Sequence, residues 1–166
     1  MKKTILLFSL FATSMIFAQQ EINSNNSWLK AGLNVGLPVG DVHDFSSVAV
    51  GADLRGQYLV TSHFGIGGAT GYTHYFGKNG SDDFGVIPVA AFARYYFQSE
   101  GVFVGADLGY GFLTNTPNNS GGLYVNPQIG YHNSKWNVYG FFQNTFAEKN
   151  VNVQNVGIGA TYNLKF

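Results

Sequence analysis

The chain has 166 residues, a length typical of one domain, and its nine Lys and Arg balance its nine Asp and Glu. Such neutrality disfavours a nucleic-acid-binding protein, which would carry a basic patch. There is no cysteine, so a disulfide scaffold, thiolate catalysis and cysteine-based metal sites are excluded, and an aromatic content of 16% disfavours disorder.

The N-terminal segment has the organisation of a secretory signal peptide. Lys2 and Lys3 give a positive start, residues 4–17 are uncharged and mostly apolar, and a polar run follows Ala18. The apolar run is too short to cross a bilayer as a helix, which needs about 20 residues. We therefore expect residues 1–18 to be a signal peptide cleaved after Ala18, and residues 19–27 to be a short flexible lead-in.

From residue 28 onward, hydrophobicity alternates with period two between clusters of Gly, Asn, Asp and Ser, and no helical stripe is sustained. The pattern predicts eight strands, at 28–37, 47–58, 63–76, 85–97, 101–113, 122–132, 136–146 and 152–166. Each has ten or more residues, as a tilted membrane-spanning strand requires, whereas strands of soluble proteins centre on five or six. Pro88 and Pro127 fall inside two of them and each removes a ladder donor, so a bulge or fraying is expected there.

The connections between the predicted strands alternate in length. Tight turns are predicted at 59–62, 98–100 and 133–135, and longer polar loops at 38–46, 77–84, 114–121 and 147–151. An even number of strands with short turns at one end and longer loops at the other is typical of bacterial outer-membrane barrels. The predicted fold is all-β: an eight-stranded antiparallel up-and-down transmembrane β-barrel over residues 28–166.

The two faces of the predicted strands differ in composition. One is bulky and apolar, while the other carries Gly, Asn, Thr and the charged residues Lys30, Asp53, Arg55, Arg94, Asp107 and Lys165. Small residues with a few opposite charges suit a narrow interior better than a solvated exterior, so we expect the apolar face to meet lipid.

An ion network is predicted inside the barrel, formed by Lys30, Asp53, Arg55, Arg94 and Asp107. Asp53 and Arg55 are two residues apart on one face, and Arg94 and Asp107 lie on strands joined by a tight turn. Opposite charges there should pair, because an unpaired buried charge is costly. Such a network would close the lumen to solutes.

Aromatic residues concentrate near the ends of the strands. Those of the predicted girdle are Trp28, Tyr58, Tyr95, Phe97, Tyr131 and Trp136 at the turn side, and Tyr72, Phe76, Phe112 and Phe142 at the loop side. Aromatic rings are enriched at both membrane–water interfaces, so these residues are predicted to mark the two edges of the bilayer.

The closing segment resembles the C-terminal signal of bacterial outer-membrane barrels, with Gly159, Tyr162, Leu164 and Phe166 at the matching positions. Together with the export signal and the strand ladder, it makes residues 28–166 similar to the barrel domain of the OmpA/OmpX-like superfamily. The resemblance implies the outer membrane of a Gram-negative cell, contact with its lipids and lipopolysaccharide, and biogenesis through periplasmic chaperones and the β-barrel assembly machinery.

The predicted role is structural, in a monomeric envelope barrel with a closed lumen and no nucleic-acid partner. A narrow porin-like channel for small solutes or ions is one alternative. A barrel that binds or adheres through its surface loops is another, although the predicted loops are only five to nine residues long.

An enzyme is the alternative that the spacing disfavours. His132 and Ser134 have a His-x-Ser spacing that resembles the active site of lipid A deacylase barrels, and Glu148 lies 14 residues beyond Ser134. The intervening strand would place Glu148 at the opposite rim, about 30 Å away. The protein is therefore predicted to be non-enzymatic, and its sequence shows no motif for a metal or a cofactor.

Overall fold

The computed structural model describes residues 27–117, 119–148 and 151–165. Its strands are β1 (Ser27–Val39), β2 (Ser46–Thr61), β3 (Phe64–Gly77), β4 (Phe84–Tyr96), β5 (Gly101–Thr114), β6 (Gly121–His132), β7 (Trp136–Ala147) and β8 (Asn152–Lys165). One short 3-10 turn, η1 (Gly40–Val42), follows β1. Across these described ranges, no helix is long and apolar enough to cross a membrane. The predicted signal peptide, most of the lead-in and Phe166 lie outside the described residues.

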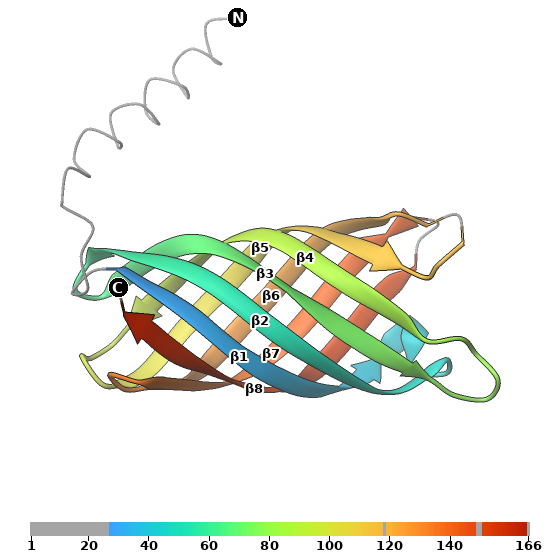
Figure 1. Ribbon diagram of the computed structural model, residues 1–166, viewed down its shortest axis with the longest axis horizontal. Coiled ribbons are helices and arrows are strands. Elements are labelled where there is room, and N and C mark those ends of the chain that lie inside the picture. Colours follow the sequence, from blue (N-terminus) through green and yellow to red (C-terminus); the bar gives the residue numbers. More distant parts are fainter. Residues whose placement is uncertain (1–26, 118, 149–150, 166) are drawn as a thin grey trace, which may run out of the picture.

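The strands form one closed antiparallel barrel in chain order (Figure 1). Each strand pairs with the next, and β8 closes the ring by pairing with β1 from Trp28↔Lys165 to Val39↔Gln154. The start of β1 and the end of β8 lie at one end of the barrel, and the β3–β4 loop lies at the other (Figure 1). Closure leaves no unpaired sheet edge, which is the condition for a sheet to reside in lipid.

The predicted fold and all eight strands are confirmed, with ends that agree within three residues. The largest difference is at the end of β2, which continues to Thr61 instead of residue 58. The pairing Thr61↔Phe64 extends the β2–β3 hairpin after an irregularity between Leu59 and Thr61, so the turn expected at 59–62 is shorter.

Both internal prolines are accommodated without a bulge. Pro88 pairs with Gly111 on β5, while the β3–β4 ladder is interrupted between Thr70↔Val89 and Thr73↔Val86 and resumes in the same register. Pro127 behaves alike: it pairs with Ala106 on β5, and the β6–β7 ladder skips its position. Each proline therefore weakens one ladder locally and shifts no strand.

The barrel is apolar outside and largely polar inside. Its exterior exposes Leu, Ile, Val, Phe, Tyr and Trp side chains along every strand, among them Leu33, Leu108 and Ile158. Among the described residues, buried polar side chains outnumber buried apolar ones. This is the reverse of a soluble barrel, whose core is apolar and whose surface is solvated. The expected orientation of the two faces is thus the observed one.

Candidate functional site: the barrel lumen

The five charged residues of the predicted network all face the interior. Lys30, Arg55, Arg94 and Asp107 are at most 2% exposed, and Asp53 is half-buried. They come from β1, β2, β4 and β5. The side chain of the sixth strand charge, Lys165, lies outside the described residues.

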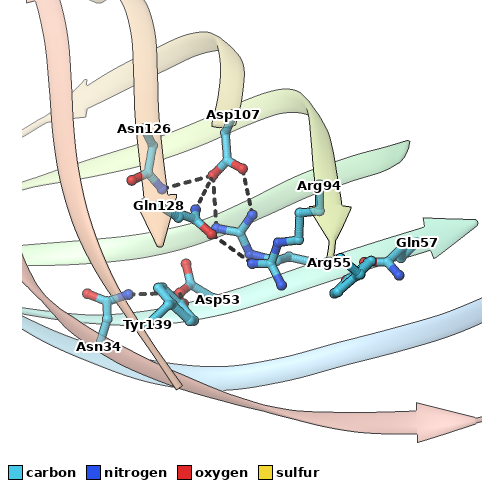
Figure 2. Close-up of polar contacts among 10 residues, drawn as sticks. Asn34, Asp53, Arg55, Gln57, Arg94, Asp107, Asn126, Gln128 and Tyr139 are labelled. Atoms are coloured by element: carbon cyan, nitrogen blue, oxygen red, sulfur yellow. Dashed lines mark hydrogen bonds and ion pairs between the residues drawn. The ribbon is translucent and has the colours of Figure 1, made fainter. Parts of the chain in front are cut away.

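A bidentate ion pair crosses the lumen between β2 and β5, which are not neighbours in the barrel (Figure 2). Arg55 Nη1 and Nη2 donate to the two carboxylate oxygens of Asp107, at 2.7 and 2.9 Å. Asn126 and Gln128 of β6 donate to Asp107 Oδ2 as well, at 2.8 and 3.0 Å. Asp107 is therefore the centre of the network, held by one cation and two amides.

Arg94 has no carboxylate partner. Its Nη2 donates to Gln128 Oε1 at 2.7 Å, while Nε and Nη1 are buried with no hydrogen-bond acceptor. The guanidinium lies 4.7 Å from the ring centre of Phe103 and 5.6 Å from that of Tyr139, within reach of cation–π attraction. A tight turn joins the strands of Arg94 and Asp107 and suggested that they pair, but Asp107 binds Arg55 from across the lumen instead.

Arg94 is accommodated by a glycine on the neighbouring strand. A Cβ added to Gly105 would lie 2.7 Å from Arg94 Cγ, closer than such atoms approach in proteins. The strand registry places these two residues opposite each other. Any larger residue at position 105 would displace the arginine from its aromatic surroundings.

Asp53 and Lys30 bind neutral partners. Asp53 Oδ2 accepts hydrogen bonds from Tyr139 Oη at 2.5 Å and from Asn34 Nδ2 at 3.1 Å (Figure 2). Lys30 Nζ donates to Tyr96 Oη at 3.2 Å and to Asn137 Oδ1 at 3.1 Å. The network is thus a set of hydrogen bonds with one internal ion pair rather than a chain of alternating charges.

Two further clusters fill the lumen on either side of the ion pair. At the loop end, Val42, Ala49, Tyr75, Val86 and Val153 form a buried apolar cluster. Toward the turn end, Tyr96, Phe103, Tyr139 and Phe141 form a second, aromatic cluster. At the turn-side mouth the interior leaves a cavity of about 350 Å³, lined by residues that include Lys30 and Tyr96.

The predicted girdle faces outward, except at one residue. Tyr72, Phe76, Tyr95, Phe97, Phe112, Tyr131, Trp136 and Phe142 are exposed, and Tyr58 shares their outward face. Trp28, in contrast, lies on the face of Lys30, whose Nζ is 5.8 Å from its ring, and it lines the turn-side cavity. The prediction that Trp28 belongs to the girdle was wrong. Trp28 does lie near a strand end, but it is two residues from Lys30 and therefore shares the inward face of the strand.

The residues of the terminal signal divide between the faces. Tyr162 and Leu164 are exposed, whereas Gly159 is buried and a Cβ there would lie 2.7 Å from the ring of Tyr139. The strand register places Gly159 directly opposite Tyr139. Phe166 lies outside the described residues.

The structure does not bring the His-x-Ser residues and Glu148 together. His132 Nε2 contacts Gln98 O at 3.1 Å at the turn end, while Glu148 Oε1 accepts from Ser120 Oγ at the loop end. Among the described residues, no group of three His, Asp or Glu side chains is placed to hold a metal ion.

A histidine–carboxylate contact, not anticipated from the sequence, lies on the exterior at the loop end. His74 Nε2 is 3.1 Å from Asp83 Oδ2, and the other ring nitrogen is 3.2 Å from Tyr72 Oη. The backbone N–H of Gly77 donates to Asp83 at 2.8 Å. That hydrogen bond, followed by the one from His74, lowers the pKa of Asp83 below its usual value. Period-two spacing puts Tyr72 and His74 on one face, but the sequence gives no sign that the loop returns Asp83 to them.

No protein-family model and no curated protein matches the chain. Solved structures do match it. Ail, the attachment invasion locus protein of Yersinia pestis, aligns with a TM-score of 0.61 and 14% identity, covering 84% of this chain and 98% of that one. Neisserial surface protein A aligns with a TM-score of 0.51 and 14% identity over 86% and 99%. A de novo designed transmembrane β-barrel aligns at 0.52, with 16% identity over 86% and 100%.

Identities this low establish the architecture and nothing finer. The apolar exterior, the polar filled lumen and the closed ladder agree with it independently. The chain has the fold of a small eight-stranded antiparallel β-barrel, as in Ail and Neisserial surface protein A.

Proposed function

We propose that the protein is a non-enzymatic structural barrel of the bacterial outer membrane whose lumen is closed by its own side chains. The observation that carries this proposal is the Arg55–Asp107 ion pair, which joins β2 to β5 across the lumen at 2.7 Å. Hydrogen bonds from Lys30 on β1 to Tyr96 on β4, and from Tyr139 on β7 to Asp53 on β2, cross it as well. Several of these contacts would have to break before water could form a continuous path through the lumen.

The exterior supports residence in a bilayer. Large apolar side chains are exposed on every strand, and an exposed apolar surface of that extent is unstable in water. The aromatic residues near both strand ends suit the two interfaces of the membrane. The loop end would then contact lipopolysaccharide and the turn end the periplasmic leaflet, with the barrel acting as a monomer.

The biogenesis that fits such a barrel begins with cleavage of residues 1–18. Chaperones of the periplasm would carry the unfolded chain, and the β-barrel assembly machinery would bind the segment around Gly159, Tyr162, Leu164 and Phe166. The outward position of Tyr162 and Leu164 suits this role, because both side chains stay accessible along the strand that closes the barrel.

A polyanion-binding role of the external loops is not supported. Ail has been solved in complex with the heparin analogue sucrose octasulfate. In this chain the loop-end connections carry five acidic residues, Asp41, Asp44, Asp82, Asp83 and Glu148, against the two lysines Lys78 and Lys149. A loop surface with this charge repels a sulfated sugar.

Conductance of the purified protein in planar bilayers tests the proposal. A closed lumen predicts no steady ohmic current in the native protein. The Asp107→Ala variant removes the centre of the network, and we expect it to show conducting events more often than the native protein. Asp82→Ala, in an external loop, is the matched control and should behave as the native chain. Steady current through the native protein would show a channel and overturn the closed lumen.

A further inference from the structure

The turn-side mouth of the barrel contains a cavity with a chemical character of its own. Its volume of about 350 Å³ falls in the range of sites for small molecules. The residues that matter for a ligand are Trp28, Lys30, Gln57, Leu59, Tyr96 and Asn163, which line it together. Two aromatic rings and one leucine thus share the lining with a single ammonium group, and the remaining lining residues are four amides, three serines and one histidine.

Lys30 is buried, and no carboxylate of the described residues lies within ion-pair distance of its ammonium group. Its side chain is 2% exposed, and its two hydrogen-bond partners, Tyr96 Oη and Asn137 Oδ1, are neutral. An ammonium has three donors, so one N–H of Lys30 is left without an assigned acceptor. Among the described residues, the only ion pairs are Arg55–Asp107 and His74–Asp83.

The two carboxylates of the described interior, Asp53 and Asp107, both bind other partners. Asp107 holds both terminal nitrogens of Arg55, and Asp53 accepts from Asn34 and Tyr139. The residue opposite Lys30 in the β1–β2 ladder is Arg55, a second cation. The described interior thus holds Lys30, Arg55 and Arg94 against Asp53 and Asp107, an excess of one positive charge. Keeping a buried charge unpaired is costly, and an anion in the cavity removes that cost.

We propose that the turn-side cavity binds a small organic carboxylate, with its charged group on Lys30 Nζ. Its apolar body would lie against Trp28 and Leu59, and Gln57, whose Oε1 accepts from Tyr96 Oη, would donate from Nε2 to the second carboxylate oxygen. A monoanion fits better than phosphate, since Lys30 is the one Lys or Arg among the described residues that line this cavity, and His132 already contacts Gln98 O. The site is independent of whether the lumen conducts.

Calorimetric titration of the purified full chain in a non-ionic detergent tests the site. Benzoate is the probe, and benzamide and benzylammonium are its neutral and cationic counterparts of similar size. We expect saturable binding of benzoate and at least tenfold weaker binding of the other two. Lys30→Met should reduce benzoate binding at least tenfold, to the level of benzamide. Lys78→Met, in the loop at the other end of the barrel, is the matched control and should bind as the native chain.

Equal binding of the three probes to the native chain would overturn the proposal, and so would undiminished benzoate binding in Lys30→Met. The first comparison needs no variant, so it decides the question even if Lys30→Met does not fold. If the native protein shows no steady current and also does not bind benzoate, the proposed anion site is overturned and the closed lumen is not.

Discussion

The two ends of the barrel interior are closed by different means. At the loop end, Val42, Tyr75 and Val153 belong to a dry apolar cluster, as in a soluble core. In the middle and toward the turn end, charged and amide groups share the lumen with the aromatic cluster and leave a cavity at the mouth. An apolar cluster tolerates approximate packing, whereas a buried polar network is stable only when each member keeps its partner. Single substitutions among the charged and amide residues of the lumen should therefore lower the stability of the barrel more than those in the apolar cluster.

The largest effect is expected at the centre of the network. Asp107→Ala leaves the Arg55 guanidinium buried without its anion and removes the acceptor of Asn126 and Gln128. Breaking a buried pair in this way costs about 3–5 kcal/mol of unfolding free energy. Urea unfolding in lipid vesicles measures it, and the exposed Asp82→Ala should change the value by less than about 0.5 kcal/mol.

The same comparison predicts a rescue. Replacing both partners, as in Arg55→Met with Asp107→Leu, removes the uncompensated charge and should recover most of the stability lost in Asp107→Ala. A double variant as unstable as the single one would mean that Asn126 and Gln128, rather than the ion pair, dominate the network.

A smaller effect is expected where the backbone makes room for Arg94. Gly105→Ala places a methyl group 2.7 Å from Arg94 Cγ, and accommodating it should cost about 1–3 kcal/mol in the same unfolding measurement. Gly68→Ala is the matched control, because nothing lies within 4 Å of a Cβ there. Equal stability of the two variants would show that Arg94 moves freely, contrary to a tightly filled lumen.

The strand ladder and the faces were predictable from the sequence because both depend on neighbours along the chain. Period two decides which side a residue takes, and the hairpin decides what it faces on the next strand. Trp28 illustrates the rule: its phase, shared with Lys30, already places it inward, and only its nearness to a strand end suggested otherwise.

The pairing of charges across the lumen was not predictable in the same way. Arg55 and Asp107 are 52 residues apart on strands that are not neighbours in the barrel, and their contact depends on the tilt and stagger of the closed barrel. Arg94 and Asp107 looked closer in the sequence, but Arg94 pairs opposite Gly105 in the ladder and turns toward Phe103 instead. The spacing of residues along a strand predicts which side chains face the lumen. The geometry of the closed barrel determines which of these side chains pair with one another.

The two tryptophans sharpen the distinction between interior and exterior. Trp136 is 48% exposed on the outer face, whereas Trp28 lines the turn-side cavity. In vesicles of brominated lipid, the fluorescence of Trp136 in a Trp28→Phe variant should be quenched at least twofold more than that of Trp28 in Trp136→Phe. Equal quenching would mean that Trp28 faces lipid, as the girdle prediction had it.

The smallest effect is expected on the exterior, at Asp83. Its folded-state pKa lies below the usual value because the Gly77 N–H and His74 bind the carboxylate. A lowered folded-state pKa stabilises the fold above the ordinary aspartate pKa of about 4, and that contribution is lost as the pH falls through the folded value. Asp83→Asn should thus be slightly less stable than the native chain at pH 7 and should approach it near pH 3. Asp82→Asn, next in the same loop, is the matched control at pH 7. If the two variants are equally stable there, the contacts of Asp83 with Gly77 and His74 contribute nothing to the stability of the barrel.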